Sequence, residues 1–451
     1  MENWRDDLAN WLAPFVAALG HKTRARMCPA YIAGLIGPGD RKSVQPMAAR
    51  DAAVSYDQLH HFIADGVWDS TPLEAALLAE VDRLVGGENA FLVIDDTCLP
   101  KKGDRSVCVA PQYASALGKT ANCQSLVSVT LASHEVPVMV GLRLFLPEVW
   151  TSDPDRMARA RIPEDLQIAQ SKPEIAILEI DRVRAAGVRF GCVLADAGYG
   201  SSGPFRQALS ARGLNWAVGL SRRQNVYPAD VGLVFPEAAR GRRRKYHLPD
   251  RLAVSAELML DAGKWRKVNW RRGTKGKLSC QFAAARVRIA DGHRNRMADG
   301  RVQAMPGDED VWLIGERRAT GERKYYASNL PSDTPIKALA AAIKARWICE
   351  QAHQQLKEEL GLDHFEGRSW VGLHRHALMT MIATAFLQSR RLTAAGRKKE
   401  SPARRRSQPC QPSGKPSSIF SPIHRPCDAL PVKGLSEGKT TICQSSAKTS
   451  A

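Results

Sequence analysis

The sequence lacks the cysteine spacing and the long hydrophobic runs that mark two large classes of protein. Its ten cysteines are scattered and include no C-x-x-C pair, which argues against a zinc knuckle or a disulfide scaffold and favours a reducing compartment. The N-terminal segment, MENWRDDLANW, is acidic and amphipathic, unlike a secretory signal peptide. The hydrophobic run at residues 377–387 is shorter than the roughly 18 residues that a membrane helix needs. These absences predict a cytoplasmic protein without a membrane partner.

Two catalytic signatures are missing as well. The sequence contains no glycine-rich phosphate loop and no serine nucleophile elbow, so neither ATP use nor acyl transfer is supported. Acidic residues are outnumbered, since 65 lysines and arginines face 46 aspartates and glutamates and give a net charge of +19. A charge of this size and sign favours a polyanionic partner such as DNA, although solubility alone is an alternative explanation.

What the sequence does contain predicts an α/β protein built from several segments. Residues 1–88 carry apolar side chains at helical spacing, which predicts a helical N-terminal domain that we expect to bind DNA. Residues 89–222 begin with strand-like runs and continue with alternating helices and strands. This order predicts the first part of a catalytic core, a mixed sheet with helices packed on it.

A basic segment interrupts this core. Residues 223–328 are rich in turns and strand-like runs, which predicts a β-rich insertion. Arginines and lysines alternate with tryptophans here, a composition that suits phosphate contacts and base stacking. An exposed basic face without a dedicated ligand is the alternative. The residues of this insertion that we expect to contact DNA are Trp265, Arg266, Lys267, Trp270, Arg271 and Arg272.

The chain beyond the insertion contains the strongest helix signal and then an abrupt change. Residues 329–390 are expected to complete the core, with one long helix at 333–361. The last 62 residues carry 13 lysines and arginines against three acidic residues, together with seven prolines. Residues 391–451 are therefore predicted to be a basic disordered tail. Its abrupt onset would fit a frameshifted or eroded terminus.

Three acidic residues occupy positions where a carboxylate is costly unless it is paired or binds a metal. Asp95 ends one buried strand-like run and Asp196 ends another. At about 100° per residue, Glu350 falls on the same helical stripe as Leu339 and Ile343. Each acid alone is more often structural, but three oxygen donors without cysteine or histidine companions suit Mg²⁺ or Mn²⁺. Such a cluster can hold two ions that cleave a phosphodiester.

Several short motifs, found in a fixed order, make the sequence resemble a known family. They are V-I-D-D-T-x3-K-K-G at 93–103, A-D-A-G-Y-G at 195–200, W-R-K-V-x4-G-T-K-G at 265–276 and R-W-I-C-E-Q-A-H-Q-Q-L-K-E-E-L at 346–360. In these motifs the chain resembles the DDE transposases of bacterial insertion sequences, most closely the seven-oh-one group. The resemblance implies a ribonuclease-H-like catalytic fold, with a helical N-terminal domain and a β-rich insertion.

The resemblance also implies roles for individual residues. The catalytic and metal-binding acids would be Asp95, Asp196 and Glu350, with two Mg²⁺ or Mn²⁺ ions. The DNA contacts near them would be Arg346 and Lys357. Lys101 and Lys102 are further candidates because they come just after the first acid, and a solvated turn explains them equally well. The related Y-x2-R-x3-E-x6-K signature is matched except at its first position, where Ile343 replaces tyrosine.

The expected function is Mg²⁺-dependent transposition. The enzyme would hydrolyse DNA at the terminal repeats of a mobile element and then direct the freed 3′-hydroxyl to attack target DNA. Because two element ends must meet, the resemblance implies a homodimer on DNA, associated with the nucleoid when bound. Two alternatives stay open: a metal-dependent nuclease or resolvase that does not join strands, and a catalytically inactive DNA-binding relic.

Overall fold

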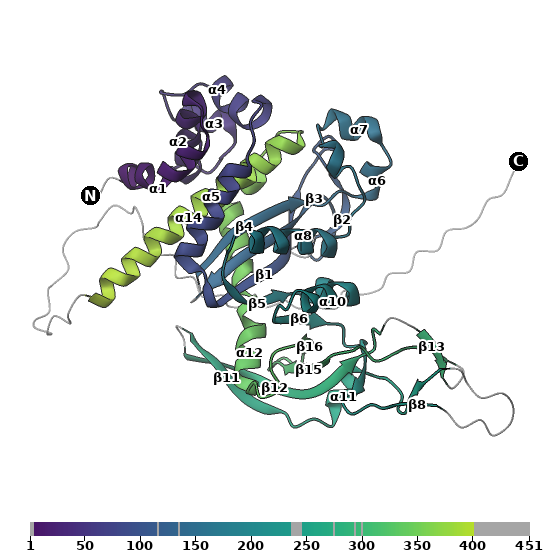
Figure 1. Ribbon diagram of the computed structural model, residues 1–451. Helices are drawn as coiled ribbons and strands as arrows, with labels where there is room; N and C mark the ends of the chain where they lie inside the picture. The colour runs from purple at the N-terminus through teal and green to yellow at the C-terminus, as the bar shows by residue number, and fades with distance from the viewer. Residues whose placement is uncertain are drawn as a thin grey trace, which may run out of the picture. The chain divides into compact units, whose positions relative to one another are not determined.

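A mixed β-sheet with helices on both faces organises the described chain (Figure 1). The computed structural model describes residues 4–114, 117–133, 136–235, 246–273, 276–292, 295–298 and 301–400. Within these ranges, twelve strands belong to one continuous sheet and four others pair in two small ribbons. This architecture confirms the predicted α/β class, a ribonuclease-H-like mixed sheet flanked by helices.

The N-terminal segment is helical, as the spacing of its apolar residues predicted. In α5, the residues Leu73, Leu77 and Val81 follow the helical repeat and are buried. Glu74 of the same helix accepts a hydrogen bond from Arg143 of β4 at 3.0 Å, so charge as well as packing binds this helix to the sheet. The helices are α1 (Trp4–Ala18), α2 (Lys22–Ile36), α3 (Val44–Ala49), α4 (Tyr56–His60), the π-helical turn η1 (His61–Asp65) and α5 (Thr71–Val85).

Six strands form the core half of the sheet. Five follow the spatial order β4–β3–β1–β5–β6, and β2 also pairs antiparallel with β3. β3 is antiparallel to each of its partners, whereas β5 and β6 run parallel to β1. Parallel strands need crossover connections, and α8 and α10 provide them. The strands are β1 (Gly87–Pro100), β2 (Ala110–Ala114), β3 (Lys119–Ser133), β4 (Val136–Leu144), β5 (Phe190–Ala195) and β6 (Trp216–Leu220). The helices between them are α6 (Glu148–Thr151), α7 (Pro154–Arg159), η3 (Glu164–Leu166), α8 (Lys172–Ala185), α9 (Ala197–Gly200) and α10 (Gly203–Ala211).

The β-rich segment predicted at 223–328 extends the core sheet. β16 pairs antiparallel with β6, and β15, β12, β7 and β10 follow, while β11 pairs with β12. Residues 1–399 cluster as one compact unit, and the boundaries expected near 88, 222 and 328 stay predictions. The elements are β7 (Asn225–Pro228), β8 (Leu233–Val234), β9 (Leu248–Pro249), β10 (Val254–Ser255), α11 (Ala256–Asp261), β11 (Arg266–Gly273), β12 (Gly276–Ile289), β13 (Asn295–Ala298), β14 (Arg301–Ala304), β15 (Asp310–Arg317) and β16 (Arg323–Ser328).

The single long helix predicted at 333–361 is two helices in the structure. Between them, Cys349 N donates to Arg346 O at 3.1 Å, an i→i+3 bond that tightens the chain into a 3₁₀-like turn. The prediction of one helix was wrong because apolar spacing does not register so short a change of helical pitch. The C-terminal elements are α12 (Ile336–Ala345), α13 (Ile348–Glu358), η4 (Leu362–His364) and α14 (Trp370–Glu400).

The last helix also corrects the predicted start of the tail. Residues 391–400, expected to be disordered, continue α14. Leu392 packs against the hydrophobic core, and the first proline that would end the helix comes only at position 402. The rest of the predicted tail, residues 401–451, lies outside the described residues.

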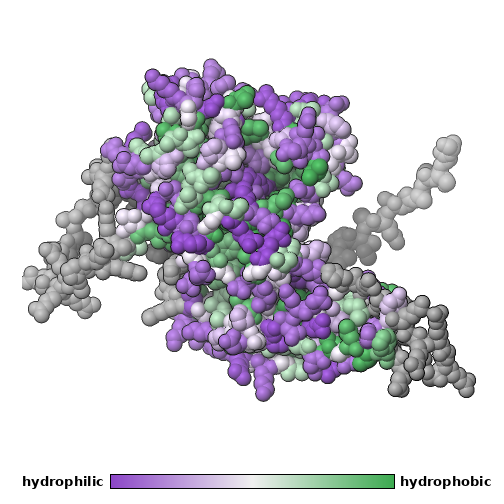
Figure 2. Space-filling view, viewed as in Figure 1, coloured by the Kyte–Doolittle hydropathy of each residue, from purple (hydrophilic) through white to green (hydrophobic). Residues whose placement is uncertain are grey.

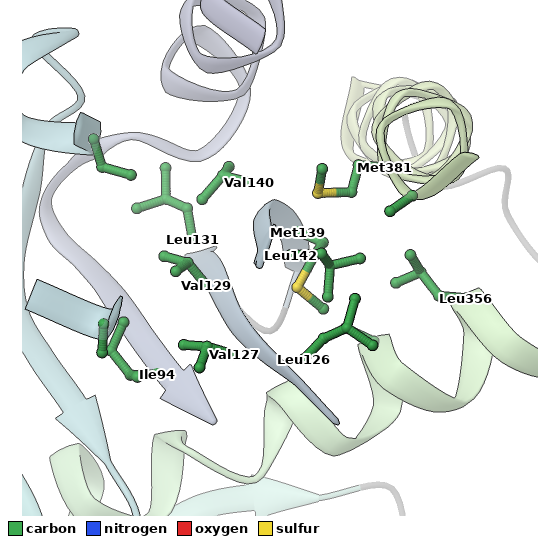
Figure 3. Packing of buried hydrophobic residues seen from close by; sticks show 14 of the residues in the cluster. Ile94, Leu126, Val127, Val129, Leu131, Met139, Val140, Leu142, Leu356 and Met381 are labelled. Atoms are coloured by element: carbon green, nitrogen blue, oxygen red, sulfur yellow. The ribbon is translucent and has the colours of Figure 1, made fainter. Parts of the chain in front are cut away.

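Helices cover the two faces of the sheet differently. α12, α13 and α14 lie on one face, where Leu356 of α13 and Met381 of α14 meet the side chains of Met139 and Leu142 (Figure 3). α5 and α8 lie on the other face, where Glu74 and Glu179 both bind Arg143. Asp95 points to the α12–α13 face, since it pairs in register with Ser128, whose hydroxyl contacts α13.

The surface is mostly hydrophilic on the face shown in Figure 2, with a hydrophobic area near β8. In that segment Leu233, Val234 and Phe235 are exposed. Every helix in the described residues falls short of the length and hydropathy required for a membrane crossing.

Candidate active site

The first acidic residue lies within a strand, beside the end of its parallel neighbour. β1 continues through Asp95 and Asp96, paired with β3 along this whole stretch. The prediction that the strand ends at these carboxylates was therefore wrong, because β3 supplies backbone partners on one side. On the other side, the β1–β5 pairing ends at Ile94 and Ala195. Asp95 and Asp196 thus occupy neighbouring positions, one residue beyond the parallel pairing.

The Asp95 carboxylate is largely buried and is held by two donors, one from the turn between α12 and α13 and one from the first turn of α13. Its side chain is 13% exposed. Arg346 Nη1 donates to Asp95 Oδ2 at 2.6 Å, and the Cys349 thiol lies 3.0 Å from the same oxygen. Asp95 Oδ1 accepts the backbone N–H of Asp96 at 2.9 Å. Burial and the nearby charge of Asp95 raise the pKa of the Cys349 thiol well above its usual value, so this thiol is a neutral donor.

Asp196 directly follows β5 and caps the short helix α9. One of its oxygens accepts the backbone N–H groups of Gly198 at 2.9 Å and Tyr199 at 3.2 Å. Burial, followed by the negative charge of Asp95, raises the pKa of Asp196 above its usual value. The two carboxylates therefore lie close enough to repel each other, which is an arrangement that a shared cation relieves.

α9 lies against β6 because two glycines face each other there. A methyl group at Gly219 would lie 2.6 Å from Ala197 N, and one at Gly200 would collide with the carbonyl oxygen of Gly219. No side chain fits in this contact, so glycine at both positions fixes the place of Asp196 relative to the sheet.

Glu350 has a half-exposed side chain on α13, and Arg346 connects it to Asp95. Arg346 Nη2 donates to Glu350 Oε1 at 3.2 Å while Nη1 holds Asp95. Burial alone would lower the pKa of Arg346, but the neighbouring negative charges outweigh it and raise that pKa. The carboxylate oxygens of Asp95, Asp196 and Glu350 are donors that suit Mg²⁺. In the described residues, however, no three acidic, histidine or cysteine side chains are grouped to hold one metal ion.

Asp96 belongs to a separate cluster, because neighbouring residues of a strand point to opposite faces. Lys172 Nζ donates to Asp96 Oδ2 at 2.6 Å, and the Tyr199 hydroxyl donates to Asp96 Oδ1. Sequence reasoning missed this cluster. The alternation along β1 could have separated the two aspartates, but no spacing or motif links Lys172 to a residue 76 positions away.

Comparison with known proteins places this arrangement in a family. Residues 14–277 match a family model described as DDE superfamily endonuclease. The chain belongs to this family. It is also 32% identical over 196 residues to the probable transposase for insertion sequence element IS701 of Microchaete diplosiphon, a match that covers 43% of this chain and 48% of that protein. The chain thus spans about half the length of this curated relative. Asp95 and Asp196 lie within the family match, whereas Glu350 lies beyond it.

In this member of the DDE superfamily, a buried histidine links α13 to the strand that carries Asp95. His353 Nε2 and Ser128 Oγ lie 2.7 Å apart, and Ser128 Oγ donates to Asp95 O at 2.9 Å. Since the Ser128 proton is committed to Asp95, His353 Nε2 must donate to Ser128. Burial lowers the pKa of His353 to about 4, so the ring is neutral at neutral pH.

The lysines expected to contact phosphate have different surroundings. Lys357 Nζ donates to Cys98 O at 2.9 Å. Lys101 Nζ donates to two backbone carbonyls next to η4, at 2.8 and 3.2 Å. Burial lowers the pKa of both lysines. Lys102, in contrast, is exposed. The structure therefore gives Lys101 a role within the fold and leaves Lys102 at the surface.

The two tryptophans of the β-rich segment, Trp265 and Trp270, pack against other side chains of the protein. The Arg317 guanidinium lies 4.3 Å from the ring centre of Trp265. Trp270 contacts Phe282 edge to face at 5.8 Å, and Lys344 Nζ lies 5.2 Å from its ring centre. Both indoles thus contribute to packing, a role that composition alone did not distinguish from base stacking.

The structure describes the side chains of three of the four basic residues of β11 that were predicted to contact DNA. Arg266, Lys267 and Arg271 are exposed. The side chain of Arg272 lies outside the described part of the chain. The predicted DNA contacts of these four residues stay predictions.

Proposed function

We propose that this protein is a transposase that cleaves DNA at the ends of a mobile element and joins the freed ends to target DNA. The observation that carries the proposal is the meeting of Asp95 and Asp196, whose burial and mutual repulsion raise the pKa of Asp196. Membership of the DDE endonucleases and the likeness to a probable transposase support the same chemistry.

Asp95, Asp196 and Glu350 would hold the Mg²⁺ or Mn²⁺ ions. Asp96 would not take part, because its side chain points to the other face of the sheet and binds Lys172 there. Enzymes of the DDE superfamily generally use divalent metals. When bound, such ions lower the pKa of a coordinated water and stabilise the leaving oxygen. Asp95 is oriented from two sides, by the Asp96 N–H and by the Arg346 guanidinium, so its carboxylate is fixed in place before a ligand arrives.

Cationic side chains near the acids and on β11 would contact the DNA. Arg346, in the turn before α13, and Lys357, on α13, lie on either side of Glu350 in the sequence, and a phosphate beside the cleavage point would lie near them. The more distant contacts would come from Lys102, Arg266, Lys267, Arg271 and Arg272, whereas Lys101 is already bound to backbone carbonyls. Because two element ends must be joined, we expect two copies of the chain to act together on DNA.

Incubation of the purified full-length protein with duplex DNA from both flanks of its own gene tests the proposal. With Mg²⁺ we expect nicks at the element ends and joined products with a target plasmid, and with EDTA neither. Because binding to phosphates releases counterions, retention of the same DNA in a filter assay should weaken steeply as salt rises.

The matched family is described as an endonuclease, and this favours one rival function, DNA cleavage without strand joining. A metal-dependent nuclease would use the same acids and produce nicks without joined product. The joined product therefore decides between the two. A protein that retains DNA but produces neither nicks nor joined product with Mg²⁺ or Mn²⁺ would instead be an inactive relic.

A further inference from the structure

Arg346 forms ion pairs with two of the three candidate acids. Its two terminal nitrogens hold different acids, Asp95 at 2.6 Å and Glu350 at 3.2 Å. The side chain of Arg346 is 25% exposed and that of Asp95 13%, so solvent screens this pair incompletely. The charge of Arg346 also acts on Asp196, where it opposes the rise in pKa. A single guanidinium thus interacts electrostatically with all three acids.

A guanidinium and a divalent ion would compete for the same oxygens. Asp95 Oδ2 already accepts Arg346 and lies beside the Cys349 thiol, and Glu350 Oε1 accepts the other end of the guanidinium. A second cation at these oxygens would be repelled by Arg346 unless that side chain moved. Arg346 lies in the tight turn between α12 and α13, where i→i+3 bonds replace the regular helical pattern, so its movement needs only a local change.

We propose that Arg346 is an internal counter-ion that closes the acidic site in the absence of metal and leaves Asp95 when a divalent ion binds. This inference rests on the proposed function, because it takes the three acids as the metal ligands. Once released, the guanidinium has donors free for a DNA phosphate. Metal and phosphate binding then assist each other, because each favours the state in which Arg346 has left Asp95.

Lys172 supplies a matched control. It forms an ion pair of the same length, 2.6 Å, with the adjacent carboxylate, Asp96, and its side chain is 26% exposed. Since Asp96 points to the opposite face of the sheet, Lys172 does not block Asp95. Neutralising Lys172 or Arg346 removes the same charge from the same neighbourhood, and only the second change opens the proposed metal site.

The test is the affinity of the full-length protein for Mn²⁺ without DNA, measured by electron paramagnetic resonance of the free ion. Arg346→Gln should bind Mn²⁺ about tenfold more tightly than the wild type, because one competing ion pair is gone. Lys172→Gln should differ from the wild type by no more than about twofold, the effect of a general loss of positive charge.

Equal Mn²⁺ affinity in Arg346→Gln and the wild type would overturn the inference. So would equal gains in the two variants, because any lost positive charge would then suffice. If Arg346→Gln does not fold, Arg346→Lys takes its place. A lysine holds one acid where the arginine holds two, so we expect about threefold tighter binding, and no gain would again count against the proposal.

The two proposals fail separately. Joined DNA products from the wild type, together with unchanged Mn²⁺ affinity in Arg346→Gln, would remove only the counter-ion role. Tighter Mn²⁺ binding in Arg346→Gln, with no cleavage by the wild type, would remove the transposase function and leave the counter-ion role in place.

Discussion

Two carboxylates in the two halves of the sheet show how surroundings separate a site from a scaffold. In the β-rich half, the fully buried Glu316 accepts hydrogen bonds from Lys344 at 2.8 Å and from Tyr326 at 2.9 Å. Burial would raise the pKa of Glu316, but these partners outweigh it and lower that pKa. In the core half, Asp196 lies near Asp95, and its pKa is raised.

The difference shows that the charges and hydrogen-bond partners around a carboxylate, more than the type of residue, mark the candidate site. Glu316 is a charge that the fold has compensated, and its role is to hold β15 against α12. Asp196 is a charge that the fold leaves partly uncompensated, a condition that recurs where proteins bind or react. The predictions that follow test this division, beginning with the largest expected effect.

Neutralising the acids of the core half should have the largest effect. Asp95→Asn and Asp196→Asn are each expected to lower DNA cleavage by on the order of a thousandfold, since metal-assisted catalysis contributes several kcal/mol. Glu316→Gln is the control from the other half, and it should lower the melting temperature while cleavage per folded molecule stays within about threefold. A gel assay of nicked DNA and thermal unfolding measure the two effects. If Glu316→Gln loses as much cleavage as Asp95→Asn, the division between a scaffold carboxylate and site carboxylates is wrong.

The buried histidines of the core half predict a loss of stability in acid. Burial lowers the pKa values of His353, His374 and His376 to about 4, from an ordinary value of 6.5. Between these values the unfolded chain binds more protons than the folded one, so stability falls as pH drops from about 6.5 to about 4 and is unaffected by these groups above 6.5. Melting temperatures across this range measure the effect.

One histidine variant sharpens that measurement. His353→Gln removes one of three similar groups and should reduce the histidine part of the acid-induced loss by about a third. It should also be less stable than the wild type at pH 7, because the link to Ser128 is disturbed. An unchanged pH profile in this variant would show that His353 does not titrate as its burial implies.

A smaller effect should separate packing from DNA contact on β11. Trp270→Ala is expected to lose about 2 kcal/mol of stability or more, because its ring packs against Phe282, with little change in DNA affinity. The double variant Arg266→Gln, Lys267→Gln should keep its melting temperature and lower the salt dependence of DNA binding by about two phosphate contacts. Binding isotherms at several salt concentrations measure this. If Trp270→Ala instead lowers DNA affinity and leaves stability unchanged, Trp270 stacks on bases.

The smallest expected effect distinguishes two adjacent lysines. Lys101→Met leaves two backbone carbonyls without their donor and should cost about 1–2 kcal/mol of stability. Lys102→Met should leave stability unchanged and weaken DNA binding by about one phosphate contact. Chemical denaturation and DNA titration of both variants measure the difference. A salt dependence altered equally by both changes would show that Lys101 leaves its carbonyls to bind DNA.

The sequence marked the acidic candidates more sharply than the basic candidates for a physical reason. A carboxylate in a buried setting is costly unless it is paired or binds a metal, so several such positions together, as with Asp95 and Asp196, stand out even though each alone is more often structural. A surface arginine or tryptophan has many roles, so the pattern that marked Trp265 and Trp270 could not show that Arg317 and Phe282 already contact them.

Local patterns also predicted the strands and helices of the core, because periodicity reports burial. They missed features that depend on distant partners or on backbone detail. The continuation of β1 past Asp95 depends on β3, and the turn between α12 and α13 is a change of pitch within a helical sequence. The bridge from Arg346 to Asp95 joins residues 251 positions apart, beyond the reach of any local pattern.

The glycine contact between α9 and β6 makes the second acid sensitive to a change that alters no charge. A single methyl group at Gly219 would collide with the backbone of Asp196 and Ala197 at the start of α9, so the backbone that carries Asp196 would have to shift. The position of this candidate catalytic acid thus depends on the absence of a side chain at Gly219. Gly219→Ala is therefore expected to abolish the proposed DNA cleavage, although all three candidate acids remain in the chain.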